Sequence, residues 1–100
     1  MFTVRQTQEF QDWLDALKDL RAQVRIAARL RLAEAGSLGD WKPVGGEVSE
    51  MRVEVGPGYR LYFTRRGSFL IVTLAGVDKS TDVKDIKRAQ RTLKVLESAL

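Results

Sequence analysis

The sequence predicts an α+β fold, in which an antiparallel sheet packs against an N-terminal helical hairpin and is followed by a C-terminal helix. Two observations predict this fold. Three strand-like runs with short turns between them fill residues 47–76, and apolar residues recur at helical spacing before and after this stretch. We expect the element order β-α-α-β-β-β-α in a single domain that spans residues 1–100.

Two glycine-containing turns divide the central stretch into strands. A Gly-Pro-Gly turn at 56–58 separates the run 51–55 from the run 59–65, and Arg-Gly-Ser at 66–68 precedes the run 69–75. Both connections are short enough to be hairpins, so the three strands should form an antiparallel meander. The third run is apolar on both sides, which predicts a strand in the interior of the sheet.

Alternation along the first hairpin predicts one apolar face and one polar face. If Val55 pairs with Tyr59, the apolar face carries Met51, Val53, Val55, Tyr59, Leu61 and Phe63. The polar face, which we expect to be concave, carries Glu50, Arg52, Glu54, Arg60, Tyr62 and Thr64.

Helical periodicity extends from Thr7, a plausible N-cap, to Gly36, where a glycine ends the pattern. A single helix over 7–35 would be about 43 Å long, which exceeds the comfortable span of a domain of this size. A break at Asp19, itself a good N-cap, would give two helices instead. The sequence leaves both possibilities open.

The remaining segments flank these elements. Residues 2–4 could form a short strand added to the sheet, and residues 35–46 have the composition of a loop. A last helix follows a junction in which Ser80, Thr81 or Asp82 provides the cap. Its expected buried stripe is Val83, Ile86, Ala89, Leu93 and Leu96. Its basic stripe is Lys84, Lys87, Arg88, Arg91 and Lys94, which suits a solvated face as well as contact with RNA or an acidic partner.

Composition restricts the class of protein. The chain is 44% hydrophobic and 30% charged, contains no cysteine and has no apolar run long enough to span a membrane, so we expect a cytoplasmic protein. Residues 1–40 carry six basic and six acidic side chains, whereas residues 41–100 carry eleven and seven. The net charge of +4 therefore lies in the meander and the last helix.

The absence of histidine restricts the chemistry further. Histidine is the usual acid or base near neutral pH and the commonest metal ligand. Any catalysis would have to use lysine, arginine, tyrosine or carboxylate side chains, and we expect no metal or other cofactor.

The order of elements and the residues at their junctions resemble the RelE/ParE toxin superfamily, and most closely its HigB-like branch, the addiction module killer proteins. The residues that carry the resemblance are Lys42-Pro43-Val44, Glu50-Met51-Arg52, Gly58-Tyr59-Arg60-Leu61-Tyr62-Phe63 and Gly76-Val77-Asp78-Lys79-Ser80-Thr81. The resemblance covers nearly the whole chain.

The resemblance implies a toxin of a type II toxin-antitoxin system that enters the ribosome and cleaves mRNA without a metal ion. It also implies a hetero-oligomer with a cognate helix-turn-helix antitoxin of the HigA-like type and no membrane partner. A ParE-like poison of DNA gyrase with the same fold, or a module that binds nucleic acid or antitoxin without catalysis, remain alternatives.

The resemblance also assigns roles to residues. Arg60 would stabilise the phosphate, Lys79 would stabilise charge or donate a proton, and Arg52 stands about where RelE-type toxins carry a lysine base. Lys42 is the substitute candidate for that base. The residues implied to contact RNA are Tyr62, as a platform for a base, together with Arg65, Arg66, Lys84, Lys87 and Arg88. Ordinary cross-strand pairs, Arg60 with Glu54 and Arg52 with Glu50 or the Tyr62 hydroxyl, would explain some of the same residues without a function.

Overall fold

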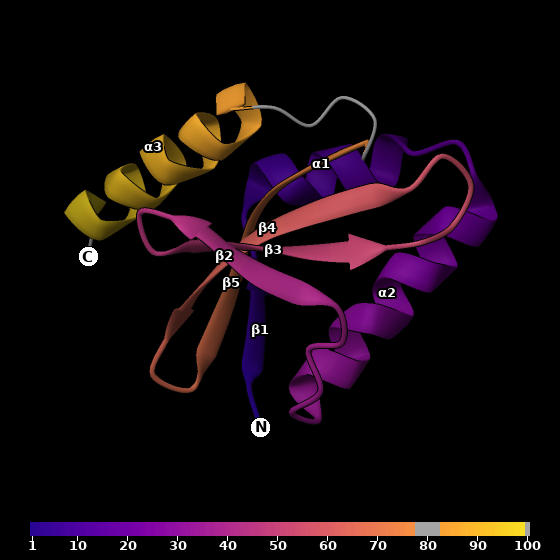
Figure 1. Cartoon of the computed structure of the whole chain (residues 1–100), viewed down its shortest axis with the longest axis horizontal. Helices are drawn as coiled ribbons and strands as arrows, with labels where there is room; N and C mark the ends of the chain where they lie inside the picture. The colour runs from indigo at the N-terminus through magenta and orange to yellow at the C-terminus, as the bar shows by residue number, and fades with distance from the viewer. Residues whose placement is uncertain (78–82, 100) are drawn as a thin grey trace.

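A computed structural model describes residues 1–77 and 83–99 and shows an α+β fold with a five-stranded mixed sheet and three helices (Figure 1). The elements are β1 (Thr3–Gln6), α1 (Gln8–Ala16), α2 (Leu20–Glu34), β2 (Trp41–Gly45), β3 (Val48–Val53), β4 (Tyr59–Arg66), β5 (Phe69–Val77) and α3 (Val83–Ala99). None of the helices in these described ranges is long and apolar enough to cross a membrane.

The strands lie in the order β1-β5-β4-β3-β2. The meander of β3, β4 and β5 is antiparallel as expected, and β5 lies in the interior of the sheet. The prediction of a wholly antiparallel sheet is wrong, because β1 pairs with β5 in parallel. A parallel pair requires a long crossover connection. Here the crossover leaves the sheet through α1 and α2 and returns through β2, β3 and β4.

The segment expected to be a loop contains an additional strand, β2, at the edge of the sheet. Its proline and glycine are typical of turns, which is why the sequence did not indicate a strand, but an edge strand tolerates Pro43. Gly46 and Glu47 form the two-residue turn to β3 and have φ angles of 60° and 64°. Positive φ at both central residues is typical of the type I′ turn that suits a tight hairpin.

The connection between β3 and β4 is longer than expected. Tyr59 pairs with Val53, whereas the sequence suggested Val55. A shift of two residues leaves each side chain on its expected face, since the period of a strand is two. Met51 and Leu61 therefore face one side of the sheet, as the alternation predicts.

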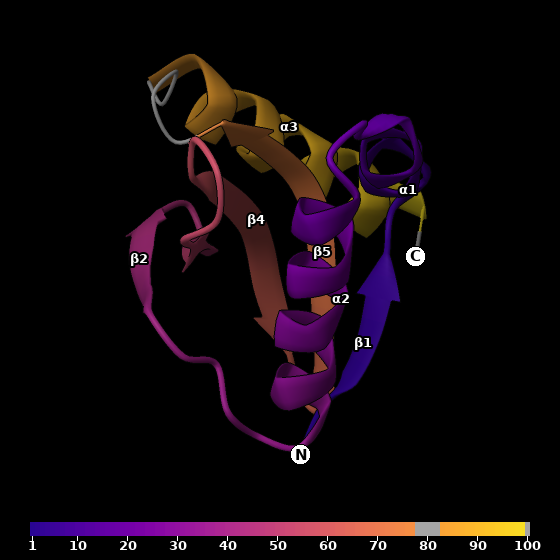
Figure 2. The same cartoon turned by 90° about the vertical axis from the view of Figure 1, so that its right-hand side faces the viewer.

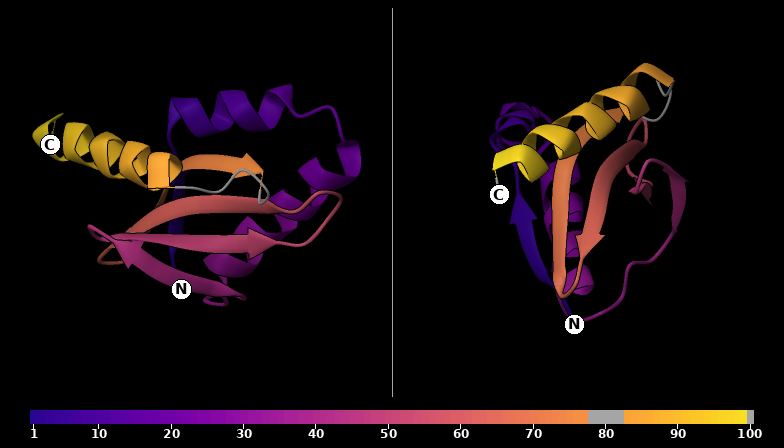
Figure 3. Two further views of the ribbon diagram at one scale, coloured as in Figure 1. Left: turned by 45° about the horizontal axis from the view of Figure 1, so that its top comes forward. Right: turned by 90° about the vertical axis from the view of Figure 1, so that its left-hand side faces the viewer.

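Helices cover both faces of the sheet, but to different extents (Figures 2 and 3). The apolar face packs against α1 and α2, with Phe10, Ile26, Met51, Leu61, Phe63, Leu70 and Val72 among its buried residues. On the other face, α3 covers a smaller cluster made of Val48, Tyr62, Leu74, Ala89 and Leu93. The polar face is thus only partly open to solvent.

The buried stripe of α3 is confirmed at Ala89 and Leu93, whereas Val83 is 62% exposed. Val83 is the first residue of the helix. The expected caps Ser80, Thr81 and Asp82 lie outside the described residues.

Two separate helices lie between β1 and β2, which decides the question that the sequence left open. The Thr7 hydroxyl accepts a hydrogen bond from the Phe10 amide and caps α1. The Asp19 carboxylate accepts bonds from the amides of Arg21 and Ala22, at 3.0 and 3.3 Å, and caps α2. The turn between the helices lets both of them pack on one face of the sheet.

Replacing Asp19 with alanine removes this cap and should lower the free energy of unfolding by about 1 kcal/mol. Asp15→Ala, an exposed aspartate in α1, is the control and should change it by less than about 0.5 kcal/mol. Urea unfolding of both variants measures the difference. A more stable Asp19→Ala protein would indicate that the chain prefers one continuous helix.

Candidate functional site

The strand register brings four charged side chains together on the polar face. Arg52 and Arg60 are direct partners across β3 and β4, and Lys42 of β2 lies opposite Glu50 of β3. Like charges directly opposite each other destabilise a sheet, so a carboxylate beside the two arginines is needed to offset their repulsion. We call Lys42, Glu50, Arg52 and Arg60 the Glu50 cluster.

Glu50 is the centre of this cluster and is only 1% exposed. Its Oε2 atom accepts a hydrogen bond from Nη1 of Arg60 at 3.1 Å. Its Oε1 atom lies 3.7 Å from Nζ of Lys42 and 3.9 Å from Nε of Arg52, and has no hydrogen-bond partner within the described ranges. A buried carboxylate is costly unless it is paired, and here three cations from three strands surround it.

The cations differ in how far they reach into solvent. The side chain of Arg60 is 15% exposed, that of Arg52 39% and that of Lys42 61%. With one carboxylate and three cations, the described cluster carries a net charge of +2, and its outer members are accessible. This arrangement favours an anion that approaches from solvent.

A small hollow gives access to the cluster. Its volume is about 180 Å³, and Asp40, Trp41, Lys42, Glu50 and Arg52 line it. Pockets for small molecules are usually 300 Å³ or larger and mostly apolar. The hollow is therefore small and polar for an enclosed metabolite, and two cations, Lys42 and Arg52, line it together with two carboxylates, Asp40 and Glu50.

The structure brings together three of the four predicted catalytic residues, namely Lys42, Arg52 and Arg60. Lys79 lies outside the described residues. Arg60 meets Glu50 on the neighbouring strand, whereas Glu54, the alternative partner, forms no ion pair in the described part of the chain.

Tyr62 is placed differently from a stacking platform. It is 1% exposed and belongs to the apolar cluster beneath α3, so a base could reach its ring only if α3 moved. Trp41, which the sequence did not single out, lines the hollow and is 37% exposed. Its ring lies 6.0 Å from the ring of buried Phe63, so Trp41 is anchored to the core while part of it stays accessible to solvent.

The arginines at the end of β4 lie apart from the cluster. The guanidinium of Arg65 lies 5.0 Å from the ring centroid of Phe2, which packs against the core on the face of α1 and α2. Arg66 hydrogen-bonds the Thr64 hydroxyl and forms an ion pair with Glu47 at 3.3 Å. Arg65 and Arg66 are neighbours in the sequence, but their side chains make contacts in different places.

The basic residues of α3 are exposed as expected, but they differ in their contacts. Lys84, Lys87 and Arg88 all face solvent. Nη2 of Arg88 lies 3.2 Å from a carboxylate oxygen of Glu9 in α1, so Arg88 links two helices. This ion pair gives Arg88 a structural role whether or not it touches RNA.

Arg29 is a positioning residue that the sequence analysis missed. Its guanidinium donates hydrogen bonds to the backbone carbonyls of Arg52 and Leu38, and the Arg52 amide donates to the carbonyl of Asp40. Burial lowers the pKa of Arg29, and the nearby Asp40 carboxylate partly opposes this shift. Arg29 thus fixes the loop before β2 against the end of β3, and with it the spacing of the cluster.

The spacing of buried residues along α2 could have indicated that Arg29 faces the sheet. It lies three residues after Ile26 and four before Ala33, which are both buried, so its side chain points toward the sheet. A charged residue on an otherwise buried face indicates a partner that must be found elsewhere in the fold. Gly39 supplies the space, because a Cβ there would lie 2.6 Å from Nη2 of Arg29.

Comparison with known sequences places the chain in a family. No model of a known protein family matches it. A protein of Haemophilus influenzae is 41% identical over 87 residues, which cover 87% of this chain and 88% of that protein. The chain belongs to the same family as this Haemophilus protein. The family member is described as an uncharacterized protein, so the family relationship supplies no activity.

Replacing Arg29 with methionine should lower the free energy of unfolding by about 2–3 kcal/mol, because two carbonyls lose a charge-assisted donor. Arg25→Met is the matched control, since Arg25 is an exposed arginine one turn earlier in α2. It should change stability by less than about 0.5 kcal/mol. Equal stability of the two variants in denaturant titration would show that Arg29 does not hold the loop.

Proposed function

We propose that this protein is a toxin of the RelE/ParE superfamily, of the HigB-like branch, that inhibits translation by cleaving mRNA on the ribosome. The observation that carries the proposal is the convergence of Lys42, Arg52 and Arg60 on one buried carboxylate. These are residues to which the family resemblance assigns the chemistry of RNA cleavage.

The charge of the cluster supports a phosphodiester as its ligand. Cleavage of RNA by its own 2′-hydroxyl passes through a pentavalent phosphorane that carries more negative charge than the starting phosphate. Preorganised cations in a partly desolvated site stabilise such a transition state more than they stabilise the ground state. Arg60 is held by its hydrogen bond to Glu50 and is therefore the best ordered of these cations.

In this proposal Glu50 takes the role of the general base in place of Lys42. Lys42 was the candidate, but it lies in an ion pair with Glu50, and an ammonium has no lone pair to accept a proton. The ionised carboxylate accepts protons, and its Oε1 atom has no hydrogen-bond donor in the described chain. We assign Glu50 as the acceptor of the 2′-hydroxyl proton. Because Glu50 is only 1% exposed, this assignment requires the exposed side chains of Lys42 and Arg52 to turn toward the RNA and uncover Oε1.

The 2′-oxygen forms a bond to phosphorus and its proton passes to Glu50, while the bond from phosphorus to the 5′-oxygen breaks. The leaving oxygen takes a proton from a cationic side chain, for which exposed Lys42 is the candidate within the described residues. The products are a 2′,3′-cyclic phosphate and a 5′-hydroxyl, and no metal takes part.

The location and partner in this proposal are those that the family resemblance implies. The toxin acts in the cytoplasm, and a HigA-like helix-turn-helix antitoxin binds it in a hetero-oligomer. A ParE-like gyrase poison is the second candidate. The exposed apolar side chains of Leu20, Val24 and Leu32 on α2 favour it, because they suit contact with a protein.

Glu50→Gln tests the catalytic assignment. Glutamine has nearly the same shape but does not act as a base, so cleavage should fall by about 100-fold or more. The change also leaves Lys42, Arg52 and Arg60 without their carboxylate, so urea unfolding of the variant is measured beside cleavage to separate lost chemistry from lost fold. Induced expression, growth measurement and mapping of mRNA 5′ ends on ribosomes provide the readout. New ends at the wild-type level with Glu50→Gln would contradict the role of Glu50. Inhibition of gyrase supercoiling without new ends would support the ParE-like alternative.

Arg60 requires a conservative substitution. Arg60→Ala would leave the Glu50 carboxylate buried without its closest partner, which commonly costs about 3–5 kcal/mol. Arg60→Lys keeps the charge but loses the planar fork of donors, so cleavage should fall by about 100-fold in a folded protein. Arg21→Lys, at an exposed position on α2, is the control and should remain toxic. Full toxicity of Arg60→Lys would contradict a phosphate-binding role.

A further inference from the structure

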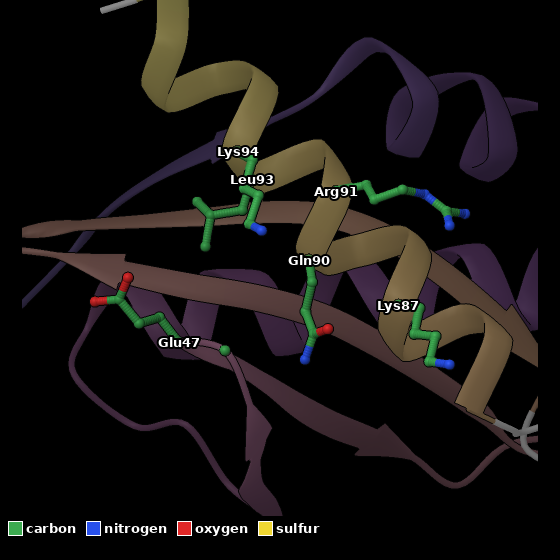
Figure 4. A pocket seen from close by; sticks show the side chains of 7 residues that line it. Glu47, Lys87, Gln90, Arg91, Leu93 and Lys94 are labelled. Carbon is green, nitrogen blue, oxygen red and sulfur yellow. The ribbon is translucent and has the colours of Figure 1, made fainter.

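A second basic site lies beside the Glu50 cluster, in a groove between α3 and the turn that joins β2 to β3 (Figure 4). The volume of the groove is about 450 Å³. Its walls are Gly46, Glu47, Lys87, Gln90, Arg91, Leu93 and Lys94. Leu93 is the only large apolar side chain among these lining residues, so the groove offers little surface to an apolar ligand.

The groove has fixed walls, because α3 is joined to the turn. Nε2 of Gln90 donates a hydrogen bond to the carbonyl of Gly45 at 3.1 Å. A Cβ at Gly46 would lie 2.8 Å from the same Nε2 atom, and the φ angle of Gly46 is 60°. Glycine at this position therefore allows both the turn and the close approach of the helix.

The charge of the groove is positive. Lys87, Arg91 and Lys94 line it with one carboxylate, that of Glu47, and Arg66 already pairs with this carboxylate from outside the groove. Within the described residues, Lys87 and Arg91 form neither a hydrogen bond nor an ion pair. These two cations are separated by about 6 Å along the helix axis and are available to an external anion.

We propose that this groove is a second phosphate-binding site, which holds the backbone of single-stranded RNA next to the phosphate at the Glu50 cluster. The proposal rests on the proposed function. Glu47 of the groove lies in the turn that leads directly into β3, and Glu50 is the third residue of β3, so one hairpin contributes to both sites. Both open on the face of the sheet that α3 partly covers, and one extended strand can therefore reach both.

An RNA backbone fits the groove better than an acidic protein segment does. A protein helix or strand that docks in a groove needs apolar anchors, and the lining provides only Leu93. Ammonium, guanidinium and amide donors in a row match successive phosphate oxygens. Recognition of this kind does not depend on the base sequence.

The test uses the full-length protein and a fluorescent single-stranded RNA whose 2′-hydroxyls are methylated, so that it binds but is not cleaved. The double variant Lys87→Ala/Arg91→Ala should raise the Kd by about 10-fold or more. The slope of log Kd against log salt concentration should fall by about 1.4, since two phosphate contacts are lost. Glu47→Gln should tighten binding by about 3-fold, because a carboxylate leaves the groove.

The matched control removes two exposed cations on the opposite side of the sheet, Lys18→Ala/Arg21→Ala. This variant has the same net charge as the test variant and should bind RNA with nearly the wild-type salt slope. Thermal unfolding of both proteins should remain close to wild type, because all four positions are exposed.

Equal Kd values and slopes for the test and control variants would overturn the proposal. It would also be overturned if Lys87→Ala/Arg91→Ala weakened only the binding of poly-glutamate, used as an acidic competitor, and not that of RNA. The proposed catalytic function fails separately. If RNA binding depends on Lys87 and Arg91 but the wild-type protein cleaves no mRNA, the groove binds RNA as proposed and the proposed nuclease activity is wrong.

Discussion

The buried carboxylate of Glu50 is the constraint on which the polar side of this structure depends. A charge that is 1% exposed is stable only with close cationic partners, and these come from β2, β3 and β4. A register shift of one residue in any of these strands would turn a partner to the other face. The Gly46–Glu47 turn and Arg29 hold that register, so the geometry of the site follows from elements at some distance from it.

Local patterns predicted the fold class because they contain the information for helices and hairpins. Thr7 and Asp19 cap the helices, and the glycine turns separate the meander strands, as the residue types indicate. The sequence did not indicate the parallel pairing of β1 or the edge strand around Pro43, because pairing between distant segments decides both. Propensity describes an edge strand poorly when its hydrogen bonds involve only one neighbour.

Part of the candidate site could be predicted, because strand alternation is also a local pattern. Alternation placed Arg52 and Arg60 on one face, and the fold brings Lys42 to them. Alternation could not show that Glu50 would be the most buried member, or that α3 would cover Tyr62. Both depend on packing between distant elements. The separation of Arg65 from Arg66 likewise follows from side-chain direction, since Arg65 lies over Phe2 and Arg66 reaches Glu47.

In the proposed reaction, the Glu50 cluster directs a 2′-hydroxyl against its neighbouring phosphate. The most direct measurement replaces the single nucleotide 5′ of the cleavage site with its 2′-deoxy form in an mRNA bound to purified ribosomes. We expect this substitution to abolish cleavage at that site, and the unmodified RNA to yield a 2′,3′-cyclic phosphate and a 5′-hydroxyl. Continued cleavage of the deoxy substrate, or a 5′-phosphate on the product, would contradict the proposed reaction.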